Sequence, residues 1–578
     1  MQKILRYKLF LSITSLLMGL LYLFLIKVEI SHIGNQSFTI ESKITQEVKF
    51  HIQTKNTSAQ LTCNNKKISF KDITKHDYWY SGEEKVFISL KQGKNSCQGK
   101  NITSNIKQKI DFTDYTLLFL LIGIPLFTLL FSLFIKLLDW IKITYPPLVT
   151  REKQQNSIHP INKWIIGILV LGVIIRILYF QKFGIMTFQH DWQGHIEFIK
   201  YMAENWSLPI PTKGFEYPQQ SLYYVLMAGL YNLLMSNGFS DMDALYGIGY
   251  FSLLCSVLFL FYGYKLINLL TQDQFTKVIA IVFISLTPSI VYLSARINND
   301  SLVMALAIIS IFYIIKSYKN NFEKYFYIAL FSVSLLFLTK ISGASIELLL
   351  LTLLIYLYYK STKEVEIKQK LYIYGLVGIF LLSFTLLRVY LPLEGSFCMI
   401  NSAEYPQQTL PSLGYDYFAS LHLIDLILTG QSHVFGLDSI RHSFLTYQYG
   451  TMFFGEFDYA NFINKTPYLK LNMQIILALG LVFIVGFISY IIHIRKEPFI
   501  NKLLFIIVTI NLLLIVRLIF MYPSICNTDF RYFVSSFVLL GFIIAKGLSY
   551  LTWLRKPISI VIGLLALSEI VFFIGLLK

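Results

Sequence analysis

The sequence predicts an all-α polytopic membrane protein with a small exported β-rich domain near its N-terminus. Of its 578 residues, 55% are hydrophobic and only 14% are charged, whereas soluble domains carry about 25% charged residues. Apolar runs of about 20 residues, enough to cross a hydrocarbon core, recur from end to end. Because these runs are solid and not alternating, a membrane β-barrel is excluded.

The net charge of +17 does not indicate a nucleic-acid partner. Most of the cations lie in short loops between apolar runs, where they set the orientation of the spans. We therefore expect a lipid bilayer as the surrounding medium and no nucleic acid.

The N-terminal segment predicts a transmembrane anchor over residues 1–28. Three cations, Lys3, Arg6 and Lys8, precede an apolar run from Leu9 to Ile26. A signal peptide has the same pattern, but no small-residue cleavage site follows, which favours a retained anchor. Under both interpretations the next segment is exported.

Residues 29–113 differ in kind from the rest of the chain. They are polar and contain period-2 alternation, as at 47–52 and 85–90, which predicts a β-sandwich-like domain. Cys63 and Cys97 are the cysteines of this segment, and an exported position predicts a disulfide between them. A sugar- or partner-binding role and a purely structural role both stay open.

The remaining chain is divided into a second helix with a cytoplasmic linker, 114–162, and a transmembrane core, 163–578. We interpret 217–234 as a helix on the membrane surface, because the Lys-rich connectors after it then all become cytoplasmic. Exported loops are expected at 181–243 and 391–469; a loop as long as the second is usually functional. The expected spans, about thirteen with the anchor, are 115–138, 163–180, 244–266, 277–294, 301–317, 324–339, 342–359, 371–390, 470–492, 502–520, 532–550 and 557–576.

Several cations oppose the positive-inside bias because they fall at the exported ends of helices. One such side chain alone could snorkel to the interface. Together they predict an anionic ligand at that face, and a lipid phosphate suits paired guanidinium groups. The set is Arg176, Arg296, Lys340, Arg388, Arg517 and Arg531, of which Arg296, Lys340, Arg517 and Arg531 are the predicted ligands of the phosphate.

Acidic residues gather at the same face. Asp191 directly follows a span, and His195 lies one helical turn later on the same side. Asp300 could be a catalytic acid or an N-cap of the next helix, and the two are compatible. Asp529 could form a local ion pair with Arg531 or mark the start of a helix. The spacing of His190 and His195 is not that of a zinc helix, so no metal ligands are predicted; a divalent cation as cofactor stays open.

Acids and phosphate-binding cations at one membrane face suit a specific reaction. An acceptor hydroxyl attacks the anomeric carbon of a lipid-phosphate sugar, and a carboxylate takes its proton. Cations stabilise the departing phosphate, and a single displacement inverts the anomeric centre. The sequence has no Gly-rich phosphate loop that would suit a nucleotide. Asp191 is therefore the predicted general base.

At these residues the chain resembles the GT-C superfamily of polyprenyl-phosphate-sugar-dependent glycosyltransferases, which includes protein O-mannosyltransferases and aminoarabinose transferases of lipid A. The resemblance covers about 160–550. It rests on four motifs in order: His190-Asp191 with His195, Glu216-Tyr217-Pro218-Gln219-Gln220, Ser294-Ala295-Arg296-Ile297-Asn298-Asn299-Asp300, and Leu338-Thr339-Lys340.

The resemblance implies that Asp191 is the catalytic base, that Asp300 lies beside it, and that Lys340 contacts the lipid phosphate. Two departures leave the donor and acceptor open. Trp192 stands where many relatives have a second acid, and Gln219 stands where they have a second proline.

Other polar residues of the exported loops are predicted to bind substrate. They are His190, His195, Glu216, Tyr217, His433, His442 and Glu456. The acceptor is a lipid A, a polysaccharide or a protein.

Two other functions stay open. A flippase or transporter of lipid-linked sugars would need polar residues along the middle of the spans, which are mostly apolar. An O-antigen ligase or polymerase would use a diphosphate donor, and the early acidic motif argues against it. The expected location is a bacterial inner membrane, with the active site facing the exterior.

Overall fold

The structure is a computed structural model. It describes residues 29–34, 37–42, 46–54, 60–64, 66–68, 83–90, 93–100, 102–108, 136, 163–185, 191–214, 216–319, 322–360, 364–393, 415–429, 443–455, 467–521 and 529–577. The predicted anchor, almost all of 114–162 and most of the loop 391–469 lie outside these ranges.

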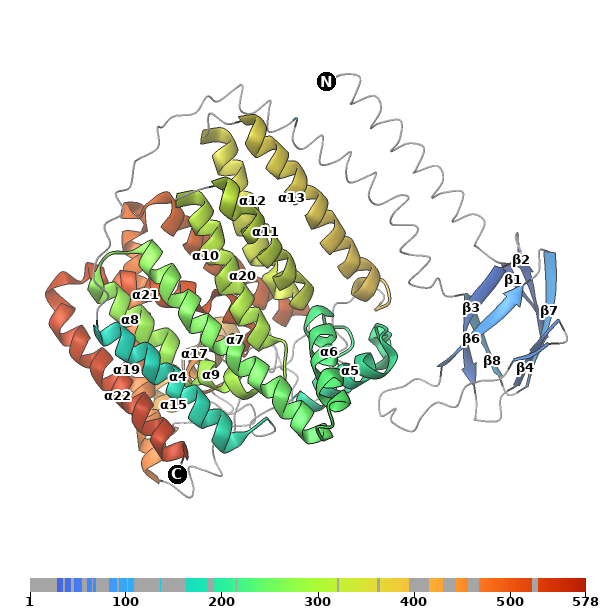
Figure 1. The fold of residues 1–578 in the computed structure, drawn as a ribbon, viewed down its shortest axis with the longest axis horizontal. Helices are drawn as coiled ribbons and strands as arrows, with labels where there is room; N and C mark the ends of the chain where they lie inside the picture. The colour runs from blue at the N-terminus through green and yellow to red at the C-terminus, as the bar shows by residue number, and fades with distance from the viewer. Residues whose placement is uncertain are drawn as a thin grey trace. The chain divides into compact units, whose positions relative to one another are not determined.

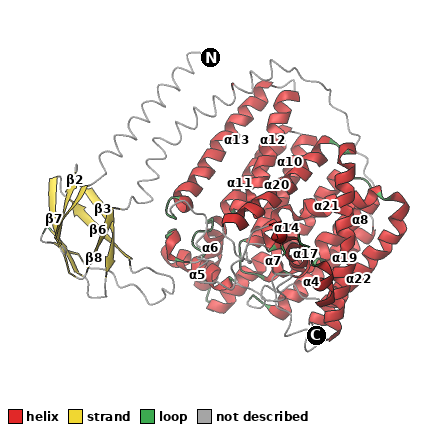
Figure 2. Cartoon of the chain, turned by 180° about the vertical axis from the view of Figure 1, so that it is seen from behind, coloured by secondary structure: helices red, strands yellow, loops and turns green. Residues whose placement is uncertain are grey.

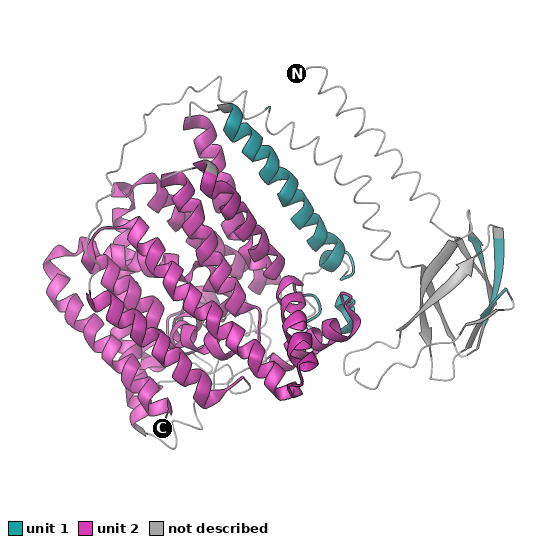
Figure 3. Ribbon diagram, viewed as in Figure 1, with its two compact units in different colours: residues 1–148, 210–218, 362–398 teal, residues 149–209, 219–361, 399–578 magenta. Residues whose placement is uncertain are grey.

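The chain divides into two compact units (Figure 3). The first comprises residues 1–148, 210–218 and 362–398, and the second comprises 149–209, 219–361 and 399–578. The domain boundaries drawn from the sequence at 28, 113 and 162 stay a prediction.

The first unit contains a β-rich segment, as the alternating sequence predicts (Figure 2). One sheet has the order β1-β2-β7-β4-β5 and another the order β6-β3-β8. Cys63 in β4 is the register partner of Cys97 in β7, and their sulfur atoms form a disulfide. The strands are β1 Glu29–Gly34, β2 Ser37–Ser42, β3 Gln46–Thr54, β4 Gln60–Cys63, β5 Lys66–Ile68, β6 Glu83–Leu90, β7 Gly93–Lys100 and β8 Ile102–Gln108.

The same unit contains α13 (Glu364–Thr385), which continues as a short π-helix, η5 (Leu386–Tyr390). Arg388 of this π-helix is buried, and its Nη2 donates to the backbone oxygen of Tyr217 at 2.9 Å.

The described part of the second unit is built mainly of helices (Figure 1). Across the described parts of both units, nine helices are long and apolar enough to cross a membrane, or ten if one bent pair is a single span. The total of about thirteen spans therefore stays a prediction. In the second unit the candidate spans are built on α4 Lys163–Phe183, α7 Asp241–Leu270, α10 Asp300–Lys319, α12 Ala344–Lys360, α19 Pro467–His493, α20 Phe499–Met521, α21 Phe537–Tyr550 (counted together with the preceding 3₁₀ turns from Phe530) and α22 Arg555–Leu577. The apolar part of α11 (Phe322–Thr339) is shorter.

The span expected at 277–294 is not one straight helix. It forms α8 (Gln274–Leu286) and α9 (Pro288–Tyr292), which continues as the 3₁₀ turn η3 (Leu293–Ala295), with a bend of 49° at the break. Pro288 explains the break, because proline has no backbone N–H and its ring clashes with the preceding turn.

Shorter helices occupy the segments expected as exported loops. In the first loop, α5 (Trp192–Asn205) is followed by α6 (Leu222–Ser236). With 15 residues, α6 is about 22 Å long, less than a hydrocarbon core of about 30 Å. This length agrees with a surface helix. The second loop contains α14 Tyr415–Ala419, α15 Leu423–Thr429 and α17 Phe444–Phe454.

Candidate active site

Asp191 forms an ion pair with Arg531, a residue 340 positions away in the chain. Asp191 lies at the N-terminal end of α5, and Arg531 lies in η9 (Phe530–Ser536), the 3₁₀ turns that lead into α21. The distance from Asp191 Oδ2 to Arg531 Nη2 is 3.1 Å. The Asp191 side chain is 25% exposed, so an incoming group can reach this carboxylate.

Asp529 also forms contacts with Arg531. The Asp529 carboxylate accepts from the backbone N–H of Arg531 at 3.2 Å and lies 3.5 Å from its Nε. Burial raises the pKa of Asp529, and the guanidinium of Arg531 opposes that shift. The local ion pair between these two residues, one of the alternatives drawn from the sequence, is therefore present.

Lys340 and Asp300 form a second pair of opposite charges. Lys340 follows the last residue of α11, and its Nζ lies 2.5 Å from Asp300 Oδ1. Asp300 is the first residue of α10 and is nearly fully buried. Its other oxygen accepts from the side chain of Asn298 at 3.5 Å. The carboxylate thus pairs with a lysine from the end of another helix.

His195 lies close to both pairs, since its protonation is influenced by the charges of Asp191, Asp300, Lys340 and Arg531. It is buried, and burial lowers its pKa to about 4. The ring is therefore neutral at pH 7 and does not add a cation. Its Nδ1 lies 2.8 Å from the hydroxyl of Tyr224, whose ring stacks on another aromatic of α5.

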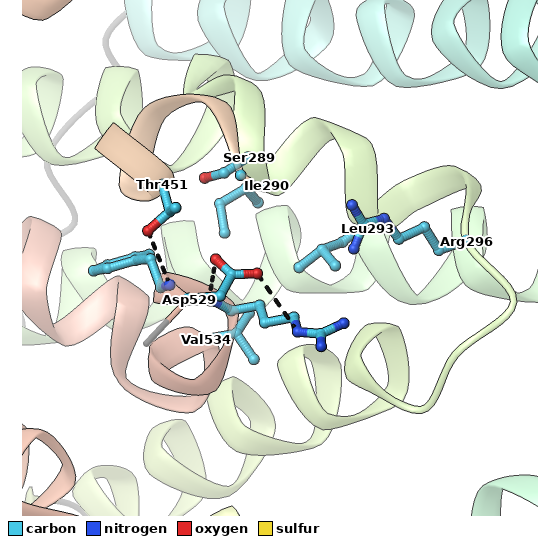
Figure 4. Close-up of a pocket in the computed structure, with 10 residues that line it drawn as sticks. Ser289, Ile290, Leu293, Arg296, Thr451, Asp529 and Val534 are labelled. Atoms are coloured by element: carbon cyan, nitrogen blue, oxygen red, sulfur yellow. Dashed lines mark hydrogen bonds and ion pairs between the residues drawn. The ribbon is translucent and has the colours of Figure 1, made fainter. Parts of the chain in front are cut away.

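A pocket opens beside Arg531 (Figure 4). Arg296 contributes a buried guanidinium whose pKa is lowered by burial. The hydroxyl of Thr451, from α17, accepts the backbone N–H of Phe530 at 3.1 Å. The lining residues are Ser289, Ile290, Leu293, Arg296, Thr451, Gly455, Asp529, Phe530, Arg531 and Val534.

Three acids and three cations are thus gathered from distant parts of the second unit. Asp191, Asp300 and Asp529 balance Arg296, Lys340 and Arg531 in number. A carboxylate that is partly exposed can accept a proton, and guanidinium and ammonium groups beside it can stabilise an anion. The arrangement suits proton abstraction next to a departing phosphate.

Other predicted residues are not part of this group of charges. Arg517 is exposed on α20, and no contact among the described residues joins it to the site. Arg176, one of the cations at the exported ends, instead donates to Ser256 and to helix carbonyls. Glu216 and Tyr217 belong to the first unit, where Glu216 is buried. His190, His433, His442 and Glu456 lie outside the described residues.

In the described ranges, no group of three or more His, Cys, Asp or Glu side chains could hold a metal ion. A divalent cation as cofactor therefore stays open, as it did from the sequence.

Several contacts of the site could not be read from the sequence. Tyr224 was not among the predicted site residues, yet its hydroxyl contacts His195. Gln219, which replaces an expected proline, accepts from the side chain of Asn299 at 3.1 Å. Gln219 thus connects the motif at 216–220 with the motif at 294–300. Thr451 lies in the expected loop 391–469, and no sequence pattern marked it as a site residue.

Comparison with known proteins gives one match to a family model. Residues 225–387 match the family described as dolichyl-phosphate-mannose-protein mannosyltransferase. This segment includes Arg296, Asp300 and Lys340 but not Asp191. No curated protein sequence matches the chain.

Three solved structures are similar at low identity. They are the oligosaccharyltransferase AglB from Archaeoglobus fulgidus (13% identity, 71% of this chain and 55% of that chain, TM-score 0.41), ArnT from Cupriavidus metallidurans (11%, 67% and 77%, TM-score 0.31) and the arabinosyltransferase EmbB from Mycobacterium smegmatis (10%, 94% and 64%, TM-score 0.32). The chain spans about half the length of the archaeal protein.

The family match covers the segment that contains the motif from Ser294 to Asp300 and the lysine at 340, two of the four motifs on which the resemblance rests. Over residues 225–387 the chain is therefore similar to the family of dolichyl-phosphate-mannose-protein mannosyltransferases.

Proposed function

We propose that the protein transfers a sugar from a polyprenyl-phosphate donor to a hydroxyl of an exported acceptor, with inversion at the anomeric carbon. Asp191 is the general base. Lys340, Arg296 and Arg531 bind the phosphate, and Asp300 positions Lys340. The acceptor is a lipid A, a polysaccharide or a protein, and the site faces the exterior of a bacterial inner membrane.

The ion pair between Asp191 and Arg531 carries this proposal. A cation at 3.1 Å favours the ionised carboxylate, which is the form that accepts a proton. The same guanidinium can hydrogen-bond to a phosphate oxygen. One contact therefore links the group that activates the acceptor to a group that stabilises the leaving phosphate.

Lys340 supports a phosphate rather than a diphosphate donor in this proposal. Its ammonium already neutralises Asp300 at 2.5 Å, and Asp191 and Asp529 flank Arg531. Among the described residues of the site the acids match the cations in number, which leaves no surplus of positive charge there for a second phosphate. A single phosphate at the leaving position suits this balance better.

The first experiment compares Asp191→Asn with the wild-type protein. The amide keeps the shape of the side chain but cannot accept the proton, so transfer should fall by about 100- to 10,000-fold. The matched control is Glu204→Gln, the same change at an exposed carboxylate of α5. Purified proteins are incubated with polyprenyl-phosphate sugars and polyprenyl-diphosphate sugars, with and without an acceptor, and the free lipid phosphate is measured.

Release of lipid phosphate only in the presence of acceptor, and only from the monophosphate donors, is the expected result. Undiminished transfer by a folded Asp191→Asn protein would remove Asp191 as the base. Turnover of the diphosphate donors alone would instead support the ligase or polymerase alternative.

A further inference from the structure

Arg176 is a buried arginine that the reaction proposed above does not use. It lies in α4, a candidate span, and its side chain is fully buried. Among the described residues no carboxylate forms an ion pair with it. Burying a charged side chain within a span costs free energy, so the groups that contact the guanidinium of Arg176 show what this residue stabilises.

The guanidinium joins three helices. Its Nε donates to the hydroxyl of Ser256 in α7 at 2.7 Å. Its Nη1 donates to the backbone oxygen of Ser285 at 2.7 Å, and its Nη2 donates to that of Ile284 at 3.3 Å, both in the last turn of α8. Gly172 lets α4 approach this turn, since a Cβ there would lie 3.0 Å from the Cβ of Ser285.

The two carbonyls that Arg176 binds lie at the break between α8 and α9. In a continuous helix the oxygen of Ile284 would accept from the N–H of residue 288, but Pro288 has none. The end of a helix leaves such carbonyls without partners and carries partial negative charge. Arg176 supplies both the missing donors and the compensating positive charge.

The segment beyond the break carries one wall of the candidate site. Ser289, Ile290, Leu293 and Arg296 all line the pocket next to Arg531. The direction of this segment depends on the 49° bend at Pro288. We therefore propose that Arg176 is a positioning residue, which holds the bent span so that Arg296 faces the pocket.

This inference rests on the proposed function only in what the pocket binds; the role of Arg176 in the bend stands by itself. The test uses two variants in the full chain. Arg176→Met removes the donors at the break. Arg176→Met/Pro288→Ala restores an N–H to residue 288 and permits a straight helix, which keeps the protein foldable. Arg495→Met, an exposed arginine in η7 (Ile494–Lys496), is the matched control.

Three quantities are measured on each protein: the thermal midpoint in detergent, the bend between α8 and α9 in an experimental structure, and the affinity for undecaprenyl phosphate. In the double variant we expect a thermal midpoint close to that of the wild type, a reduced bend, and affinity lowered by about 10-fold or more. Where turnover is measurable, kcat should fall by about 100-fold, the scale expected for a displacement of about 1 Å.

A folded double variant that keeps both the bend and the affinity of the wild type would overturn the proposal. So would an Arg176→Met protein that keeps its bend, because the carbonyls would then not need the guanidinium. If the wild type itself does not bind undecaprenyl phosphate, the proposed function fails, while the measured bend still decides the role of Arg176.

Discussion

At the residue scale, the site depends on charges that neutralise one another before any ligand arrives. Lys340 pairs with Asp300, and Arg531 bridges Asp191 and Asp529. Burying a charge costs free energy, and a partner of opposite charge offsets part of that cost. Loss of either partner leaves the other charge buried and unpaired, which destabilises the protein. A phosphate that enters the site therefore exchanges partners with existing carboxylates and does not fill an empty cationic pocket.

His195 gives a pH prediction, because burial lowers its pKa to about 4 from an ordinary value of 6.5. Between these values the unfolded chain binds a proton that the folded protein does not. Stability is therefore fully present above pH 6.5 and falls as the pH decreases toward 4. The expected loss from this residue is about 2 kcal/mol at pH 5.

The measurement compares thermal midpoints in detergent at pH 7.5 and pH 5. His195→Gln should lose less stability than the wild type on going to pH 5, because the variant has no ring to protonate. His422→Gln, at a partly exposed histidine of the long loop, serves as the control. Equal pH dependence in the wild type and the His195 variant would contradict the prediction.

The sequence predicted the identity of the charged residues better than their pairing. Asp191, Asp300, Lys340 and Arg531 were all predicted as site residues, because charge at the end of an apolar run is conspicuous, and the structure brings them into two ion pairs. That Arg531 pairs with Asp191 was not predicted, since the two are 340 positions apart and their approach depends on how helices pack. Arg176 was one of the cations at exported helix ends that together predicted an anionic ligand, and only the structure shows that it binds Ser256 and the last turn of α8.

At the element scale, the spans of the second unit were largely predictable and their irregularities were not. Hydropathy identifies a span because a bilayer demands about 20 apolar residues, and the observed helices follow the expected ranges closely. The break at Pro288 lies inside such a run, where apolar composition continues unchanged. The helices α5 and α17 lie in segments that are too mixed in composition for hydropathy to detect.

Close packing of α19 against α21 gives a prediction at this scale. A Cβ on Gly547 would clash with the backbone oxygen of Gly486, so Gly547→Ala must push the two helices apart. The expected destabilisation is about 1–3 kcal/mol or more. Thermal midpoints in detergent would show it as a clear decrease.

Gly563 in α22 provides the matched control, because a Cβ there would meet nothing within 4 Å. Gly563→Ala should be neutral or stabilising by up to about 1 kcal/mol, since alanine favours a helix. A decrease of equal size in both variants would show that the contact with Gly486 is not the cause.

At the scale of the whole molecule, the proposed reaction depends on the orientation of the protein in the membrane. A carrier lipid with an exported acceptor requires Asp191, Asp300, Lys340 and Arg531 at the exterior face. The orientation assumed for them follows from one choice, that α6 lies on the surface and does not span. Its 15 residues reach about 22 Å, and the choice keeps the Lys-rich connectors on the cytoplasmic side.

The orientation can be tested with single cysteines and a membrane-impermeant maleimide. Glu204→Cys, exposed on α5, should be labelled in intact cells, and Arg495→Cys, exposed in η7, should be labelled only after permeabilisation. Both are made in a Cys398→Ser/Cys526→Ser background, since Cys398 falls in the expected exported loop 391–469 and Cys526 falls between the expected spans 502–520 and 532–550. Cys255 is buried and should remain unlabelled.

Labelling of both positions in intact cells would mean that α6 crosses the bilayer. The reverse pattern, with Arg495→Cys labelled in intact cells and Glu204→Cys protected, would mean that the whole core is inverted. Asp191 would then face the cytoplasm, where the proposed exported acceptor is absent. In that case the charged site could still hold a lipid phosphate, but the acceptor would have to be a cytoplasmic hydroxyl. The labelling result therefore decides which class of acceptor the transfer assays should contain.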